Sequence, residues 1–142
     1  MTLREQVFRK MGWEPEHHRD DLYRWVKDGV RLNSIVATKQ EIGDEVMFPP
    51  IDEQWEVCAK YLVSFMRERN YRMSVNYREY SNRKKDCYEF CWYQLHDTEK
   101  SEMLLLYSEY MDVPRNKMSC EFIGLSKNIA EAACKAFLGV EL

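Results

Sequence analysis

The sequence contains little glycine or proline and no long apolar run. Five glycines and four prolines among 142 residues do not form a linker or a disordered segment. The longest apolar run, residues 103–106, is far shorter than the roughly 18 residues of a membrane-spanning helix. The first residues are already charged, so we expect no signal peptide. We expect residues 1–142 to form one domain.

No charge of one sign dominates the chain. Its 21 basic and 24 acidic residues are interspersed and give a net charge of −3, so we expect no duplex nucleic acid partner. Because its apolar runs are short, we expect no membrane partner. The basic cluster Arg83-Lys84-Lys85 is either a solvated turn or a phosphate contact. The cysteines, five in number, cannot all pair, which favours a reducing, cytoplasmic location.

Known catalytic motifs are missing. We find no nucleophile elbow, phosphate-binding glycine loop, zinc-protease helix or paired-cysteine motif, and we expect no catalytic residue, metal or cofactor. The stretch His17-His18 to Asp20-Asp21 is interpreted as a solvated loop. An enzyme would need an unfamiliar site, for which Glu89, Tyr93 and His96 are the titratable candidates.

Helical periodicity appears in three places. A short helix is predicted from Leu3 to Met11 and ends at Gly12. A long helix from Asp52, as its cap, to about Arg69 carries much of the core. The last helix follows Asn128, and its alanine-rich face can approach a sheet closely.

Strand-like alternation appears between these helices. Residues 22–26 and 30–32 flank an Asp28-Gly29 turn, which predicts a hairpin. Its aromatic residues, with Trp13, form either a partner surface or core packing. Residues 71–78 and 87–93 predict a second antiparallel hairpin. Further strands are predicted at residues 103–110 and 118–123, the last ending at Gly124, whereas residues 33–48 read as a loop.

Short packing motifs between Val7 and Leu138 carry a family resemblance. They are Met11-Gly12-Trp13, the hairpin with Tyr23, Trp25 and Asp28-Gly29, the pair Pro49-Pro50, Trp55-Glu56-Val57, and the final helix with Ala130-Glu131-Ala132-Ala133. Their order resembles the phage ABA sandwich domain family of small bacteriophage proteins. Together with the element order, the resemblance implies an α+β fold: a mainly antiparallel sheet of three to five strands, packed by helices in an α/β/α sandwich. The family's function is not established, so the resemblance implies no site residue.

One face of the predicted second hairpin is polar. Arginine binds phosphate or carboxylate in a bidentate way, and hydroxyl and amide groups can fix the orientation of a ligand. The candidate ligand-binding residues on this face are Arg72, Ser74, Asn76, Arg78, Glu89 and Tyr93, interleaved with Cys87 and Cys91. The alternative is a face that is exposed to solvent or covered by a helix.

Two classes of function follow from these observations. The first is a non-enzymatic phage or prophage accessory protein that binds, and sequesters, a small anionic or nucleotide-like ligand or a host defence factor. In that case it would act in the host cell cytoplasm. The second is a structural or protein-interaction module that forms a homodimer or larger homo-oligomer without a small-molecule site.

Overall fold

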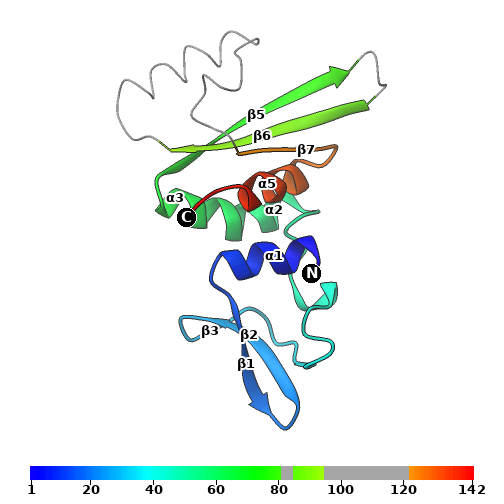
Figure 1. Ribbon diagram of the computed structural model, residues 1–142, viewed down its shortest axis with the longest axis vertical. Helices are drawn as coiled ribbons and strands as arrows, with labels where there is room; N and C mark the ends of the chain where they lie inside the picture. The colour runs from blue at the N-terminus through cyan, green and yellow to red at the C-terminus, as the bar shows by residue number, and fades with distance from the viewer. Residues whose placement is uncertain (81–84, 95–121) are drawn as a thin grey trace.

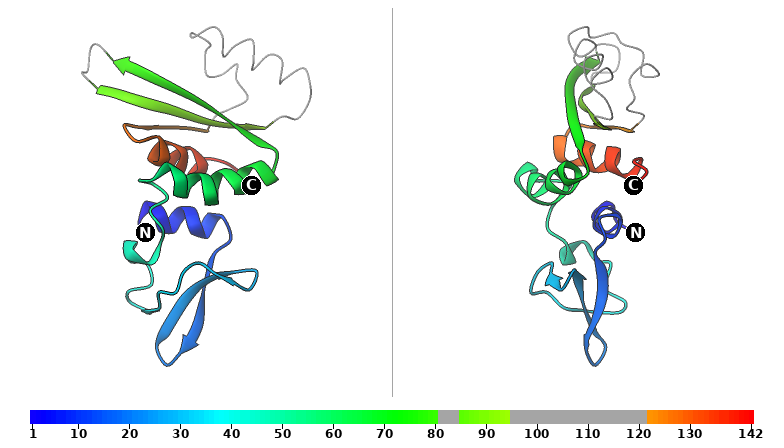
Figure 2. Two further views of the ribbon diagram at one scale, coloured as in Figure 1. Left: turned by 180° about the vertical axis from the view of Figure 1, so that it is seen from behind. Right: turned by 90° about the vertical axis from the view of Figure 1, so that its left-hand side faces the viewer.

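The computed structural model describes residues 1–80, 85–94 and 122–142. Within them, helices and two antiparallel sheets form an α+β fold in which helices pack against a sheet, as predicted. Figures 1 and 2 show the helices as a layer between the two sheets. The strand predicted at residues 103–110, most of the one at 118–123, Arg83, Lys84 and His96 lie outside the described residues.

The first helix, α1 (Leu3–Lys10), begins and ends as predicted. The Thr2 hydroxyl accepts a hydrogen bond from the Glu5 amide, at 3.2 Å, and caps the amino end. Gly12 has φ +101°, the left-handed conformation that ends a helix. Val7 and Phe8 are fully buried and face the core.

The first sheet contains four strands: β1 (Glu14–Arg19), β2 (Leu22–Lys27), β3 (Val30–Arg31) and β4 (Ala37–Thr38). Two of them were not predicted: β1, and β4, which lies in the segment 33–48 that was expected to be a loop. The β2–β3 hairpin turns at Asp28 and Gly29, both with positive φ, as its sequence predicts. The interpretation of His17-His18 as a loop is wrong, because both lie on β1, paired with β2. All six residues of β1 are exposed, so no alternation marks it in the sequence.

The segment between the first sheet and the long helix packs against the core. It contains a short 3-10 helix, η1 (Glu45–Met47), and buries Met47 and Phe48. The Trp25 indole donates to the Ile42 carbonyl at 3.0 Å, and its ring lies 4.9 Å from that of Phe48. Of the two interpretations of the amino-terminal aromatic residues, core packing is therefore correct for Trp25, whose side chain is buried.

The long helix is continuous but not uniform. It consists of α2 (Trp55–Cys58), a π-helical segment η2 (Ala59–Val63) and α3 (Ser64–Glu68). Its predicted cap is wrong: the cap position is Gln54, without a side-chain hydrogen bond, while the Asp52 carboxylate accepts from Arg4 at 2.5 Å. A tertiary ion pair thus replaces the local cap.

The second sheet has the strand order β5–β6–β7. The strands β5 (Tyr71–Tyr80) and β6 (Lys85–Gln94) form the predicted hairpin, with Arg72 opposite Tyr93, and β7 (Phe122–Ser126) pairs with β6. Phe90 and Trp92 point toward the helices and are buried. The Trp92 indole donates to the Ala133 carbonyl at 3.1 Å.

Gly124 lies inside β7 and does not end it, contrary to the sequence-based prediction. A Cβ atom there would lie 1.8 Å from the carbonyl oxygen of Ala132 in α5 (Ile129–Leu138). This glycine therefore allows close approach of strand and helix. The predicted alanine-rich face is confirmed, since Ala132, Ala133 and Ala136 are buried, and Asn128 caps α5 through the Ala130 amide.

Candidate ligand-binding cleft

A cleft of about 230 Å³ lies where the long helix passes into the second sheet. It is lined by residues of the helix, of the start of β5 and of the end of β6: Val63, Arg67, Tyr71, Arg72, Met73, Trp92 and Tyr93. Its walls are apolar and aromatic, and two guanidinium groups supply its charge. Small-molecule sites commonly combine an apolar lining with a few polar groups.

A tight connection fixes the geometry of this cleft. Between α3 and β5 the chain turns at Asn70, which has φ +63°, so only a very short link separates Arg67 from Arg72. The Gln94 side chain donates to the Arg69 carbonyl at 3.2 Å and ties the end of β6 to the same turn. The Arg69 guanidinium lies 3.4 Å from the centre of the Phe65 ring, which anchors the end of α3.

The two arginines of the cleft lack an acidic partner within the described part of the chain. Both are exposed, and no carboxylate of these residues lies within ion-pair distance of Arg67 or Arg72. Arg72 donates one hydrogen bond, to the Tyr71 carbonyl at 3.3 Å. A guanidinium has five N–H donors, so most of those on Arg72 remain for a ligand.

Tyr71 adds a neutral hydroxyl to this charge pattern. Its side chain is 5% exposed, and burial raises the pKa of its phenol above the ordinary value. At neutral pH the group therefore stays protonated, and it lies 3.5 Å from the Glu141 carbonyl oxygen as a donor. The cleft is electropositive and contains no carboxylate among its lining residues.

The structure brings two of the six predicted ligand-binding residues, Arg72 and Tyr93, into this cleft. Ser74 and Asn76 follow Arg72 along the same face of β5 but do not line the cleft. Glu89 lies on that face too, opposite Asn76, and is buried. The backbone of Arg78 pairs with that of Cys87, four residue pairs or more from the cleft end of the hairpin.

Sequence reasoning missed the helical side of the cleft. Arg67 lies in the last turn of α3, where a charged residue reads as part of a solvated helix surface. Alternation places Tyr71, Met73 and Trp92 on the apolar face of the hairpin, opposite the face that carries the predicted ligand-binding residues. The one available signal was the short separation between Arg67 and Arg72 across a predicted helix end, which places both guanidinium groups at one junction.

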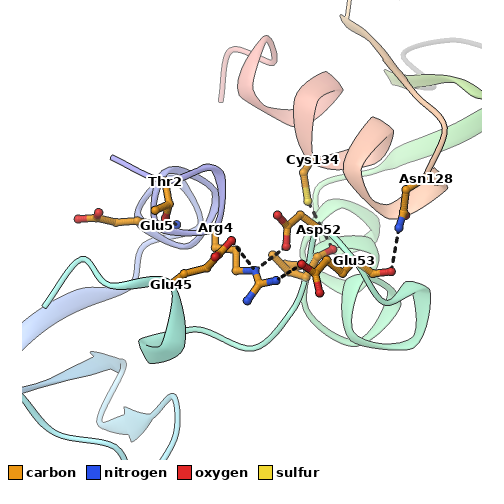
Figure 3. A network of polar contacts seen from close by, with 9 residues as sticks. Thr2, Arg4, Glu5, Glu45, Asp52, Glu53, Asn128 and Cys134 are labelled. Atoms are coloured by element: carbon orange, nitrogen blue, oxygen red, sulfur yellow. Dashed lines mark hydrogen bonds and ion pairs between the residues drawn. The ribbon is translucent and has the colours of Figure 1, made fainter. Parts of the chain in front are cut away.

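A second polar cluster surrounds Arg4, and its role is structural. The Arg4 guanidinium lies 2.5 Å from Asp52, 2.9 Å from Glu53 and 3.7 Å from Glu45, and Figure 3 shows it enclosed by these carboxylates. Burial acts to lower the pKa of Arg4, but the hydrogen bond and charge of Asp52 outweigh it and raise the pKa. The cluster joins α1 to the segment before α2, and its charges are already neutralised.

The buried cysteines offer no reactive thiol. Cys58 and Cys134 are both fully buried, and Cys134 donates to the Ile51 carbonyl at 3.6 Å. A hydrogen bond with Cys58, together with burial, raises the pKa of the Cys134 thiol far above its ordinary value. Since the thiolate is the nucleophile, these side chains serve as core packing.

The described residues contain neither a metal-ligand cluster nor a membrane-spanning helix. Residues 1–80, 85–94 and 122–142 contain no group of three or more metal-ligating side chains, and none of their helices is long and apolar enough to cross a membrane. Comparisons with protein-family models, curated proteins and solved structures gave no match for this chain.

Proposed function

We propose that this chain is a non-enzymatic binding protein that holds a small anionic ligand in the cleft between α3 and the β5–β6 hairpin. The observation that carries the proposal is the pair Arg67 and Arg72, which lie beside an apolar wall without a described acidic partner. Two guanidinium groups from different elements can bind one phosphate or carboxylate from two sides.

The apolar wall gives the ligand a second requirement. Of the cleft residues, Met73 is partly exposed, whereas Trp92 and Tyr71 are buried. A fully hydrated ion such as free sulfate gains no binding free energy from these surfaces. An anion that carries an apolar or planar group buries apolar surface area against them. A nucleotide-like molecule and a peptide carboxylate both meet this description.

The biological setting is proposed from the family resemblance. A phage or prophage accessory protein with such a cleft would sequester an anionic signal of the host or hold a host defence factor. In either role, binding alone removes the target from use, and no catalytic residue is required.

Isothermal titration calorimetry with inorganic phosphate and with AMP tests the proposed binding. Hydrogen bonds to charged groups contribute about 1.5–3 kcal/mol each, so Arg72→Ala and Arg67→Ala should each weaken binding roughly ten- to hundredfold. Arg31→Ala, which removes an exposed arginine of the first sheet, is the matched control and should leave the Kd unchanged. Equal losses in all three variants would show that the protein attracts anions only through its general charge.

The second candidate is a protein-interaction module that forms a homo-oligomer. It is favoured by a row of exposed apolar side chains on β5, formed by Met73, Val75 and Tyr77. Sedimentation velocity over a range of concentrations tests it. A stable dimer that dissociates in Val75→Lys, with no ligand binding by either form, would support this candidate over the first.

A further inference from the structure

The outer edge of β5 is the longest strand edge in the described part of the chain that no described strand covers. β5 spans ten residues, Tyr71–Tyr80, and pairs only with β6 among the strands of residues 1–80, 85–94 and 122–142. Figure 1 shows β5 as an outer strand of its sheet, extending beyond the helical layer. Such an edge presents a row of amide and carbonyl groups that can accept another strand.

The side chains along this edge alternate in the way that an added strand would use. Met73, Val75 and Tyr77 are 36%, 37% and 54% exposed on the face turned toward the helices. Their partners on β6 include Phe90 and Trp92, which the helices bury. The exposed row therefore continues the buried face of the sheet past the point where the helical layer ends.

The cleft lies at the amino-terminal end of this edge. Its lining includes Tyr71, Arg72 and Met73, the first three residues of β5. A strand that pairs antiparallel with β5 runs toward this end, so the last residues of that strand arrive beside Arg67 and Arg72. A free carboxyl terminus carries the charge that these two arginines lack.

We propose, on the basis of the anion-binding function above, that the ligand of the cleft is the carboxyl terminus of an extended peptide. The peptide adds to β5 as an antiparallel strand, its carboxylate lies between Arg67 and Arg72, and apolar side chains at alternate positions cover Met73, Val75 and Tyr77. Main-chain pairing supplies affinity in this mode of recognition, while the carboxylate and the alternate side chains supply specificity.

A second copy of the chain fits this edge less well than such a peptide. The antiparallel register that best matches the apolar row to itself places Val75 on Val75 and Met73 on Tyr77. In that register the described side chains of β5, residues 71–77, supply no carboxylate to Arg72. A peptide with a free carboxylate meets the same arginine with the opposite charge.

Fluorescence anisotropy with a synthetic hexapeptide tests the proposal. The probe is amino-terminally labelled Thr-Val-Thr-Val-Thr-Val with a free carboxyl terminus, and its control is the same peptide with a terminal amide. The free acid should bind at least tenfold more tightly than the amide, and Arg72→Gln should remove that difference. Arg31→Gln, in the first sheet, should preserve it.

Alternate N-methylation of the probe tests strand addition itself. In an added strand, only every second amide faces β5, so methylating one alternate set should abolish binding and methylating the other should leave it unchanged. Equal binding of acid and amide, or equal tolerance of both methylated sets, overturns the proposal. So does a sedimentation result in which the protein is a dimer that excludes the peptide.

Titration with inorganic phosphate separates this inference from the proposed function. Phosphate or AMP binding that depends on Arg72, with no peptide binding, overturns the peptide proposal and keeps the anion cleft. Absence of binding by phosphate, AMP and peptide overturns both. Binding of the free-acid peptide with displacement by phosphate supports both at the same site.

Discussion

The two sheets of this protein differ in how the rest of the chain supports them. The first sheet projects from the helical layer, as Figure 2 shows, and its strand β1 is exposed along its whole length. The second sheet packs on α5 through a glycine and several alanines, and β6 buries Phe90 and Trp92 against the helices. The position of the first sheet on the helical layer depends on a few anchoring residues, whereas that of the second sheet depends on close backbone packing.

This difference is informative about where a ligand can bind. The first sheet offers exposed polar side chains on a ribbon, whereas the cleft around Arg67 and Arg72 lies at the second sheet. The second sheet joins a rigid helix through a short turn, which holds Arg67 and Arg72 at fixed positions. A site on rigid elements keeps its geometry without the ligand, so less ordering entropy opposes binding.

The largest effect is expected where the second sheet meets α5. Gly124→Val places a side chain where even a Cβ lies 1.8 Å from the Ala132 carbonyl, so strand and helix must separate. We expect a loss of at least about 4 kcal/mol in the free energy of unfolding, at the upper end for overpacking. Urea denaturation measures it. Gly29→Asn, in the open turn of the first sheet, should change stability by less than about 1 kcal/mol; a similar loss in both variants would contradict the comparison.

The anchor of the first sheet should give the next largest effect. Trp25→Ala removes the one indole of β2, which contacts Phe48 and donates to Ile42, and should cost about 3 kcal/mol. Because the second sheet does not use this residue, ligand binding at the cleft should persist in the folded variant. His18→Ala, on exposed β1, should cost less than about 0.5 kcal/mol by the same urea measurement.

The joint between the amino-terminal region and the long helix should show a smaller loss. Asp52→Ala removes the closest carboxylate from Arg4, whose side chain is 10% exposed, and should cost about 2 kcal/mol. Glu45→Ala removes a mostly exposed carboxylate 3.7 Å from the same guanidinium and should cost under about 0.5 kcal/mol. If thermal unfolding shows equal losses of stability in the two variants, the short contact between Arg4 and Asp52 contributes no more to stability than the longer contact with Glu45.

The smallest effect is expected at alkaline pH, from Tyr71 of the second sheet. Burial raises the pKa of Tyr71, so the folded state holds the phenolic proton more tightly than the unfolded state. Its contribution to stability is complete below the unfolded pKa of about 10 and is lost as pH rises through the folded pKa. Urea midpoints above pH 10 should fall less steeply in Tyr71→Phe than in the native chain.

The helices and the central hairpin could be predicted because their signals are local. Alternation over residues 71–78 and 87–93 predicted two antiparallel strands and a polar face holding Arg72 and Tyr93, which the structure pairs with each other. Glycine and asparagine at positive φ mark turns by their own conformational freedom, as at Gly12 and Gly29. The packing face of α5 followed from its row of alanines.

Two wrong predictions concern residue types that have more than one structural role, and a third concerns a strand without a buried face. Asp52 is a good helix cap, but a buried arginine 48 residues earlier takes its carboxylate. Gly124 reads as a strand end, yet it is a contact point for a helix that follows in the chain. The strand β1 shows no alternation, because neither of its faces is buried and pairing with β2 alone defines it.

The sequence by itself determined the α+β class, the long amphipathic helix, and the polar and apolar faces of the central hairpin. Tertiary structure alone decided that Arg67 joins Arg72 and Tyr93 at one cleft, and that the edge of β5 extends past the helical layer. The physical reason is the separation along the chain over which each effect acts. Periodicity and turn chemistry act over a few residues, whereas a cleft depends on where separate elements come to rest against a common core.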